Sequence, residues 1–393
     1  MDGRRVLFVL KRAGMGGSCA SMINLLSLYK ERGITFDVFL MEHSGEWTQR
    51  VAQCANLLPE NTELASAIKE KSKLKGLAQY CCRIKYILSY KVRGQRAEIK
   101  RLYQAAAQKL SDRYDHVVAY QESETTEFVS YINAKHKVAW VHTDFERFWQ
   151  IGAIDDWKSN YAAFQDVVCV TEASVQSVIR NLGISADHAR LIKNMLSSKQ
   201  IRQRALEPVS EEYQRKKPFL FVSVGRLSDE KAFERIPQAA CRMAAQGMDF
   251  DWYLIGDGAS RQKILDEIRK CNVEQHVHLL GAQMNPYRFI AMADGLVITS
   301  HYEAQPMVAN EALILDKPVI STEFASVREV IRDGENGAIV AQSPEAIADA
   351  LIRFMCEHQE REKLCSGAKL FQYCNDKELA AIDALLTESE LRI

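Results

Sequence analysis

Short apolar runs alternate along the chain with longer stretches in which apolar residues recur at helical spacing. Within each run the apolar residues are continuous rather than alternating, which is typical of parallel strands buried on both faces. The order strand, helix, strand repeats through both halves and predicts an α/β fold with two doubly wound parallel sheets. The predicted strands are Val6–Leu10, Phe36–Met41, His116–Gln121, Val138–His142, Val167–Val170, Phe219–Val224, Trp252–Ile255, Val277–Leu280, Leu296–Thr299, Pro318–Ser321 and Ala338–Val340.

A polar and charged segment, SSKQIRQRALEPVSEEYQRKKP, separates the two halves of the chain. It is the best candidate for a linker, so we place the boundary near residues 197 to 217. Two such domains that face each other bring the carboxyl ends of both sheets to one cleft. Ligands of open α/β sheets bind at such a place.

The composition is that of a globular protein and narrows the possible functions. The 393 residues are 47% hydrophobic and 26% charged, with a formal net charge of zero, which argues against a dedicated nucleic-acid binder. No apolar run approaches the roughly 20 residues of a membrane span, and the first run is too short for a signal peptide. The ten cysteines are scattered without a CxxC pair, which indicates reduced cytoplasmic thiols and no zinc site.

Two carboxylates, Glu303 and Glu311, stand out in the stretch SHYEAQPMVANEALILDKPVIST. Pro306 lies between them and predicts a loop that carries Glu303, followed by a helix that carries Glu311. The residues in between then form the N-terminus of that helix, which is a place for an anion.

Two further segments could bind phosphate, and each also has a plain structural interpretation. Gly16 and Gly17 precede a helix and let a ligand approach the backbone closely, but they also suit a tight turn without a ligand. Arg226 and Lys231 follow a strand and could hold a diphosphate, but loop cations are often merely solvated. The turn LIGDG, with Asp257, is interpreted as structural.

The order of these segments resembles the retaining family-4 glycosyltransferases. The resemblance rests on GRLSDEK, LIGDG, Leu280–Gly281, ADGLVITSHYEAQPMVANEALILDKPVIST, Val330 and DGENGAIV, and it covers roughly residues 219 to 345. The Gly16–Gly17 turn and WVHTDF resemble the family more loosely. The resemblance implies the GT-B fold, with two Rossmann-like domains facing a cleft, no metal or other cofactor, and retention at the anomeric carbon.

The resemblance also implies domain roles. Residues 1–197 form an acceptor-binding domain, residues 198–370 a nucleotide-sugar-binding domain, and residues 371–393 a helical segment that crosses back to the first domain. A lipid-linked or glycan acceptor and a UDP-linked donor are expected.

Site residues are carried over from the family's E-x7-E motif and its neighbours. Glu303 is expected beside the donor sugar and Glu311 at the ribose, because carboxylates bind vicinal hydroxyls well. Arg226 and Lys231 are expected to neutralise the leaving diphosphate, and His142 to lie near the reacting sugar. The backbone amides expected to meet the diphosphate belong to Met307, Val308 and Ala309.

The chain departs from the family pattern at three places. Ala304 stands where the family commonly has glycine after the first glutamate, and Ala232 replaces the glycine of the family's Lys-Gly. The family's His-Asp is spread over residues 142–144. No required charge is lost, but the change at Ala304 leaves the identity of the donor sugar open.

A basic arm runs from Lys69 to Arg101 with only Glu70 and Glu98 to oppose its cations. It is interpreted either as amphipathic helices for an anionic membrane surface or as a solvated helical face.

The sequence therefore predicts a cytoplasmic retaining glycosyltransferase of polysaccharide or glycoconjugate synthesis, active at the inner face of the membrane if the arm binds lipid. Two alternatives stay open. One is a non-catalytic partner subunit that binds nucleotide or glycan, and the other is a nucleotide-sugar epimerase or hydrolase.

Overall fold

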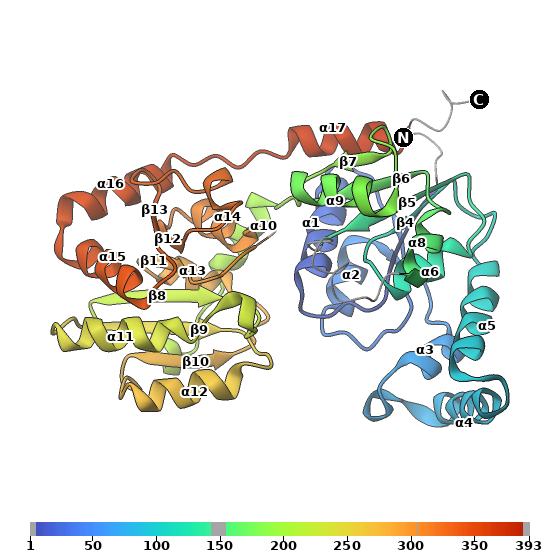
Figure 1. Cartoon of the computed structure of the whole chain (residues 1–393), viewed down its shortest axis with the longest axis horizontal. Helices are drawn as coiled ribbons and strands as arrows, with labels where there is room; N and C mark the ends of the chain where they lie inside the picture. Colours follow the sequence, from blue (N-terminus) through green and yellow to red (C-terminus); the bar gives the residue numbers. More distant parts are fainter. Residues whose placement is uncertain (1–4, 143–154, 304, 388–393) are drawn as a thin grey trace. The chain divides into compact units, whose positions relative to one another are not determined.

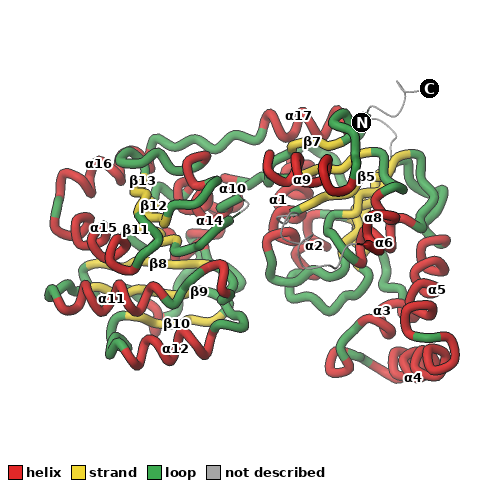
Figure 2. The backbone as a smooth tube through the Cα atoms, viewed as in Figure 1, coloured by secondary structure: helices red, strands yellow, loops and turns green. Residues whose placement is uncertain are grey.

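The computed structural model describes residues 5–142, 155–303 and 305–387 of the chain (Figure 1). The chain divides into two compact units. Unit 1 comprises residues 1–195 together with 375–393, and unit 2 comprises residues 196–374. In each unit, helices cover both faces of a parallel sheet (Figure 2). This confirms the predicted α/β class with two doubly wound parallel sheets.

Unit 1 is built on a seven-stranded parallel sheet in the order β3-β2-β1-β4-β5-β6-β7. The central strand β1 is completely buried, because Val6, Phe8 and Leu10 pack on one face while Leu7 and Val9 pack on the other. Because helices cover both faces of the sheet, every residue of β1 has to be apolar. The strands are β1 (Val6–Leu10), β2 (Asp37–Leu40), β3 (Asn56–Leu57), β4 (His116–Ala119), β5 (His136–Val141), β6 (Asp166–Cys169) and β7 (Ala189–Leu191).

The helices of unit 1 connect these strands by crossovers and cover the sheet. The helices are α1 (Gly17–Glu31), α2 (Thr48–Cys54), α3 (Thr62–Ile68), α4 (Gly76–Arg93), α5 (Gln95–Gln108), α6 (Glu124–Ser130), α8 (Asp155–Tyr161), α9 (Glu172–Leu182) and α17 (Asp376–Leu385), with a 3-10 turn η1 (Lys71–Lys73).

Unit 2 has a six-stranded parallel sheet in the order β10-β9-β8-β11-β12-β13. Its strands are β8 (Phe219–Val224), β9 (Phe250–Ile255), β10 (Val277–Gly281), β11 (Gly295–Ile298), β12 (Val319–Thr322) and β13 (Gly337–Val340). Its helices are α10 (Ser198–Ala205), α11 (Arg235–Ala245), α12 (Arg261–Lys270), α13 (Tyr287–Met292), α14 (Met307–Ile314), α15 (Pro344–Cys356) and α16 (His358–Lys369), with 3-10 turns η2 (Glu211–Tyr213), η3 (Asp229–Lys231) and η4 (Val327–Glu329).

The expected linker at residues 197–217 is part of unit 2, and this corrects the interpretation of that segment. Ser197 begins α10 by accepting a hydrogen bond from the Gln200 backbone N–H. Ile201 is then buried in the same apolar core as Leu220 and Leu313. Ile201 is the only buried residue of α10, so the sequence shows no apolar face by which this helix could be predicted.

Two edge strands, β3 and β7, were also not predicted. β3 is only two residues long and β7 three, so neither has the apolar length that identifies a strand in a sequence. Both gain their regular structure from pairing with β2 and β6.

The last helix, α17, is part of the core of unit 1. Ile382, Leu385 and Leu386 are buried against residues of α1 and β1. On the rim of this contact, Asp383 accepts hydrogen bonds from the Tyr29 hydroxyl at 2.8 Å and from the Arg32 guanidinium at 2.8 Å. The final helix is thus bound to α1 by an apolar face and a polar clamp.

We expect Leu385→Ala to destabilise unit 1 by about 2–5 kcal/mol, because a completely buried leucine leaves a cavity when it is truncated. Leu370→Ala is the control, since Leu370 is exposed and should contribute little. Urea unfolding of the two variants measures the difference. Equal stability of both variants would show that α17 does not contribute to the core of unit 1.

Candidate functional site

The candidate site of unit 2 lies at the carboxyl ends of β8 and β11. These strands are neighbours in the sheet although they are far apart in the sequence. The chain leaves β8 toward β9 on one side and leaves β11 toward β12 on the other, so the strand order reverses between them. Ligands of open α/β sheets bind at this kind of switch point. The loop after β8 carries Arg226 and Lys231, and the loop after β11 carries Glu303.

An ion pair between Lys231 and Glu303 joins these two loops. The Lys231 ammonium lies 2.8 Å from Glu303 Oε2, and the Glu303 side chain is only 9% exposed. The other carboxylate oxygen, Oε1, accepts a hydrogen bond of 2.7 Å from the Ser300 hydroxyl. Both oxygens of Glu303 are thus engaged, so the carboxylate is held in one orientation.

Hydroxyl side chains hold the backbone of both loops. Thr299 Oγ1 donates to the carbonyl oxygen of Lys231 at 2.8 Å, and Ser326 Oγ donates to that of Glu303 at 2.8 Å. The His301 backbone N–H donates to the Glu230 carbonyl at 2.8 Å. These supporting residues were not predicted; their only signal in the sequence was a run of hydroxyl side chains, Thr299 and Ser300, at the end of a predicted strand.

The glycine turn after β9 fixes the loop that carries Arg226. A Cβ atom at Gly256 would collide with the carbonyl oxygen of Gly225, so only glycine allows this approach. The Leu227 N–H donates to the Asp257 carbonyl oxygen at 3.0 Å. The turn is therefore structural, as predicted. The exposed Arg226 guanidinium makes no hydrogen bond or ion pair with the residues described.

The residue after Lys231 explains one departure from the family pattern. Ala232 is buried and has the left-handed conformation, with φ 48° and ψ 40°, which suits glycine better than alanine. The chain keeps the same turn with an alanine, and Lys231 keeps its position at the end of η3. Ala304, the other departure, lies outside the described residues.

Helix α14 begins directly after Pro306, as the sequence predicts, and carries Glu311 within it. Among the residues described, no side chain forms a capping hydrogen bond at its N-terminus, and its first turn holds no acidic residue. Among the three residues expected to face a diphosphate, Met307 and Val308 are half-buried and Ala309 is buried. The Met307 N–H donates to the Gln305 carbonyl at 2.8 Å and the Ala309 N–H donates to the Pro306 carbonyl at 3.0 Å. An anion at this helix start would therefore take the place of two backbone hydrogen bonds.

Glu311 is half-buried on α14 and is oriented by a tyrosine that was not predicted from the sequence. The Tyr287 hydroxyl, from α13, donates to Glu311 Oε1 at 3.2 Å. Nothing in the local sequence around Tyr287 indicates this contact. Glu303 and Glu311 therefore occupy a loop and a helix, respectively, and each has its own hydrogen-bonding partner.

In unit 1, the start of α1 has glycines that neither packing nor backbone geometry requires. Gly16 is the N-cap residue in an extended conformation with φ −157°, and Gly17 is the first residue of the helix. A Cβ atom at either position would meet no atom within 4 Å. The lack of side chains leaves room beside the uncapped helix start, which favours the interpretation that a ligand approaches there.

His142 follows the end of β5 and is the one catalytic candidate in unit 1. Its backbone N–H donates to Glu122, and its ring centroid lies 4.9 Å from that of Tyr120. Both ring nitrogens are buried. Burial lowers the pKa of His142, although Glu122 and Asn194 act in the opposite direction. Burial thus favours the neutral ring. Thr143 and Asp144, over which the family's His-Asp is spread, lie outside the described residues.

The described part of the chain shows neither a metal centre nor a membrane-spanning helix. No three His, Cys, Asp or Glu side chains gather there in a way that could hold a metal ion. No helix in those residues is long and apolar enough to cross a bilayer.

The second half of the chain matches a known protein family. Residues 208–371 match the family described as Glycosyl transferases group 1. The match lies in unit 2 and includes Arg226, Lys231, Glu303 and Glu311.

Characterised relatives match over similar segments. One is the N-acetylgalactosamine-N,N'-diacetylbacillosaminyl-diphospho-undecaprenol 4-alpha-N-acetylgalactosaminyltransferase of Campylobacter jejuni, which is 27% identical over 217 residues, 55% of this chain and 57% of that protein. Another is the lipopolysaccharide 1,6-galactosyltransferase of Salmonella typhimurium, 29% identical over 191 residues, 47% of this chain and 50% of that protein. The chain thus spans only about half the length of these relatives.

Solved structures resemble the whole chain. Anabaena Alr3699/HepE in complex with UDP and glucose has a TM-score of 0.70 and 17% identity, covering 98% of this chain and 100% of that one. A point mutant of S. aureus TarM, in complex with Fondaparinux, alpha-GlcNAc-glycerol and UDP, has a TM-score of 0.72 and 14% identity, covering 98% and 100%. At this level of identity the likeness shows the fold, which confirms the predicted GT-B class.

We expect Lys231→Met to destabilise unit 2 by about 1–3 kcal/mol, because it leaves the nearly buried Glu303 carboxylate without its counter-charge. The double variant Lys231→Met/Glu303→Gln should recover part of this loss. Lys270→Met, which breaks the exposed Lys270–Glu267 pair, is the control and should change little. The coupling energy is measured by chemical unfolding of the native protein, Lys231→Met, Glu303→Gln and the double variant. A coupling energy of zero would contradict this role of the pair.

We expect His142 to make the protein less stable as the pH falls below about 6.5, the ordinary pKa of histidine. Because burial lowers the pKa of His142, the folded protein binds a proton at this ring less readily than the unfolded chain does, so falling pH favours unfolding in that range. His142→Gln should therefore lose less stability than the native protein between pH 7 and pH 5. The exposed His358→Gln serves as the control, and identical pH profiles for the native protein and His142→Gln would contradict this prediction.

Proposed function

We propose that this protein is a retaining glycosyltransferase that moves a sugar from a UDP-linked donor to a glycan or lipid-linked acceptor, forming an α-linkage. The observation that carries the proposal is the meeting of Lys231 and Glu303 at the switch point of a sheet in a unit that matches group 1 glycosyltransferases. Arg226 and the start of α14 belong to the same carboxyl edge. Cations, a fixed carboxylate and an uncapped helix start are the groups that a nucleotide sugar needs.

Unit 2 is proposed to bind the donor through its diphosphate, sugar and ribose. In the proposed complex, the backbone N–H groups of Met307, Val308 and Ala309 bind the diphosphate at the helix start. Met307 and Ala309 then exchange their hydrogen bonds to the Gln305 and Pro306 carbonyls for bonds to phosphate oxygens. Glu311, oriented by the Tyr287 hydroxyl, accepts hydrogen bonds from the ribose hydroxyls. Glu303 accepts hydrogen bonds from the donor sugar hydroxyls.

The leaving diphosphate is stabilised by Arg226 and Lys231 as negative charge develops on it. Removing one donor that is aimed at developing charge typically lowers the rate by a factor of about 10² to 10³. In this proposal they take the part that a metal ion plays in other transferases, and no metal or other cofactor is required. The Arg226 side chain is exposed and makes no ion pair with described residues, so it can turn to a phosphate without breaking an existing contact.

The proposed reaction is a front-face displacement through an oxocarbenium-like state. The bond between the anomeric carbon and the phosphate oxygen breaks, and the acceptor oxygen bonds to the same face of the sugar. The departing phosphate oxygen takes the proton of the acceptor hydroxyl, so no protein nucleophile is needed. His142 is proposed to take part as a neutral group, because its burial disfavours the charged ring.

Several relatives support the choice of substrates. The structure of Alr3699/HepE was solved with UDP and glucose, and that of TarM with UDP and alpha-GlcNAc-glycerol. The Campylobacter relative is named for an acceptor on diphospho-undecaprenol, and the Salmonella relative for lipopolysaccharide. By analogy, we propose a role in cell-surface polysaccharide or glycoconjugate synthesis, in the cytoplasm at the inner face of the membrane.

The proposal is tested by a thermal-shift screen with UDP, GDP, ADP and their sugars. UDP and one UDP-sugar should raise the melting temperature, because a ligand that binds only the folded state stabilises it. Glu311→Ala should weaken the affinity for UDP by about 10-fold or more, through the lost ribose hydrogen bonds. No shift with any nucleotide would contradict the proposed donor site, and binding without sugar transfer would favour a non-catalytic partner subunit.

A further inference from the structure

The outer face of α4 exposes a continuous row of large apolar side chains. Leu77 is 85% exposed, Ile84 58%, Leu88 62% and Val92 86%, and Tyr80 adds to the same row at 44%. These residues recur every three or four positions, which places them on one side of the helix. In Figure 1, α4 lies on the outside of unit 1, beyond α3 and α5.

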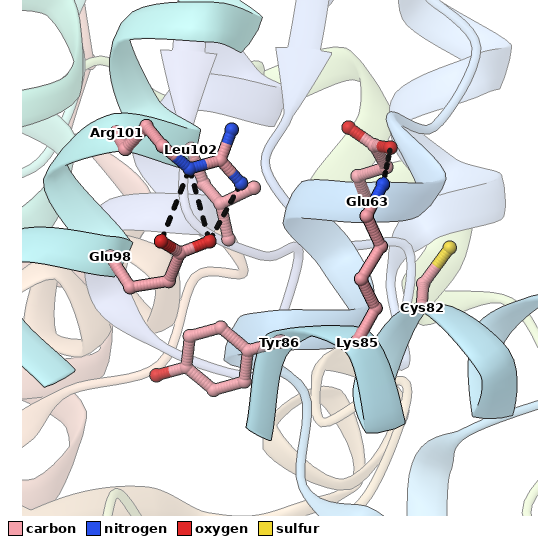
Figure 3. Close-up of a pocket in the computed structure, with 7 residues that line it drawn as sticks. All are labelled: Glu63, Cys82, Lys85, Tyr86, Glu98, Arg101 and Leu102. Carbon is pink, nitrogen blue, oxygen red and sulfur yellow. Dashed lines mark hydrogen bonds and ion pairs between the residues drawn. The ribbon is translucent and has the colours of Figure 1, made fainter. Parts of the chain in front are cut away.

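The opposite face of α4 attaches the helix firmly to unit 1. Tyr86 is buried in the apolar core that α3, α5 and α6 share with the sheet. The Arg83 guanidinium donates to the carbonyl oxygens of Ser66 and Ala67 at the end of α3. Figure 3 shows that Arg101 binds Glu98 on α5 on this side. Lys85 follows Ile84 directly and so lies on the flank between the two faces, where it contacts Glu63 of α3 at 3.8 Å. The fold therefore uses the inner face and leaves the outer apolar row without a function in folding.

The cations of the basic arm divide into two groups. One group is structural, because each member pairs with an acid of unit 1. Lys69 is buried and lies 2.6 Å from Glu60, while Arg96 binds Glu127 and Arg101 binds Glu98. These cations are therefore part of the structure of unit 1, so neither a membrane-binding face nor a solvated face can include all the cations of residues 69–101.

The second group lies on α4, as Lys85 and Lys91, and in the segment just before it, as Lys71 and Lys75. Lys71, Lys75 and Lys91 are exposed and make no ion pair with the described residues, and Lys85 contacts Glu63 only at 3.8 Å with both side chains mostly exposed. No aspartate or glutamate occurs from Lys71 to Ala97. The outer face of α4 thus combines an apolar row with a rim of positive charge that no acid on the same helix offsets.

We propose that the outer face of α4 binds the surface of an anionic lipid bilayer, with the apolar row among the acyl chains and the lysines at the headgroups. An amphipathic helix with aliphatic residues on one face and lysines beside them has the properties of an interfacial helix. Lysines near the surface add electrostatic attraction to anionic lipids, and their long stems let the ammonium groups stay in the headgroup layer.

A second copy of this chain fits the same face poorly. Two such faces in contact would bring Lys85 and Lys91 of both copies together, with no carboxylate from α4 to neutralise them. Like charges in an apolar contact are costly, whereas anionic headgroups supply the missing negative charge. The charge distribution therefore favours a lipid surface over self-association.

Lipid binding by α4 extends the proposed function without depending on it. Binding through α4 would hold unit 1 beside a lipid-linked acceptor, but vesicle binding can be measured with neither donor nor acceptor present. A failure of one proposal therefore leaves the other intact.

The test is flotation of the full chain with vesicles of phosphatidylcholine alone or with about one third phosphatidylglycerol. The native protein should bind the anionic vesicles at low salt, and binding should fall as salt rises. Ile84→Asp/Leu88→Asp should reduce the partition coefficient at least about tenfold, and Lys85→Gln/Lys91→Gln should reduce binding to anionic vesicles. Leu206→Asp, at a residue of unit 2 that is 84% exposed, is the matched control and should bind as the native protein does.

The controls separate the possible outcomes. All substituted residues have exposed or lightly paired side chains, so circular dichroism and the UDP-induced thermal shift should stay unchanged in the variants. Equal vesicle binding by the native protein and Ile84→Asp/Leu88→Asp would overturn the proposal. A lipid-free dimer that Ile84→Asp/Leu88→Asp converts to a monomer, with vesicle binding unchanged, would identify the face as a protein interface instead.

Discussion

The ion pair between Lys231 and Glu303 is the contact on which the candidate site of unit 2 depends. It joins the loops after β8 and β11, and its carboxylate is almost completely removed from water. Each partner satisfies the other in the absence of ligand, since a buried charge without a partner is strongly destabilising. A bound nucleotide sugar could contact both partners of the pair, because its phosphate oxygens can share the Lys231 ammonium and its sugar hydroxyls can donate to the Glu303 carboxylate. The site is thus preorganised by the same charges that the proposed chemistry uses.

Much of the fold could be predicted from the sequence because it rests on local signals. The run Val6–Leu10 is apolar on both faces, and Pro306 marks the start of α14. Elements that depend on distant partners were not predicted. β3 exists through its pairing with β2, and α10 was hidden because only Ile201 is buried along it. Periodicity reports burial along one segment, and it cannot report a strand or helix whose stability comes mainly from another part of the chain.

In the candidate site, the charged residues could be predicted from the sequence, but the residues that hold them in place could not. Arg226, Lys231, Glu303 and Glu311 could be selected from the sequence because their spacing resembles a known motif, and the structure brings Lys231 and Glu303 together. The groups that orient them could not be selected from the sequence, since Tyr287 and Ser326 come from other segments and belong to no motif. The basic arm shows the opposite case, in which residues that look alike in the sequence differ in the structure. Its cations look equivalent in the sequence, yet Lys69 and Arg96 neutralise acids of unit 1 while Lys91 remains exposed.

Because α17 completes the core of unit 1, the chain must make unit 2 before unit 1 can be finished. A ribosome releases residues 196–374 ahead of Ile382 and Leu385, so unit 2 can fold while the first apolar core still lacks its last layer. During that interval the surface of α1 that α17 later covers is open to water and to other nascent chains. The order of synthesis therefore leaves an apolar surface of unit 1 uncovered until the end of the chain is made, and such a surface is prone to aggregation.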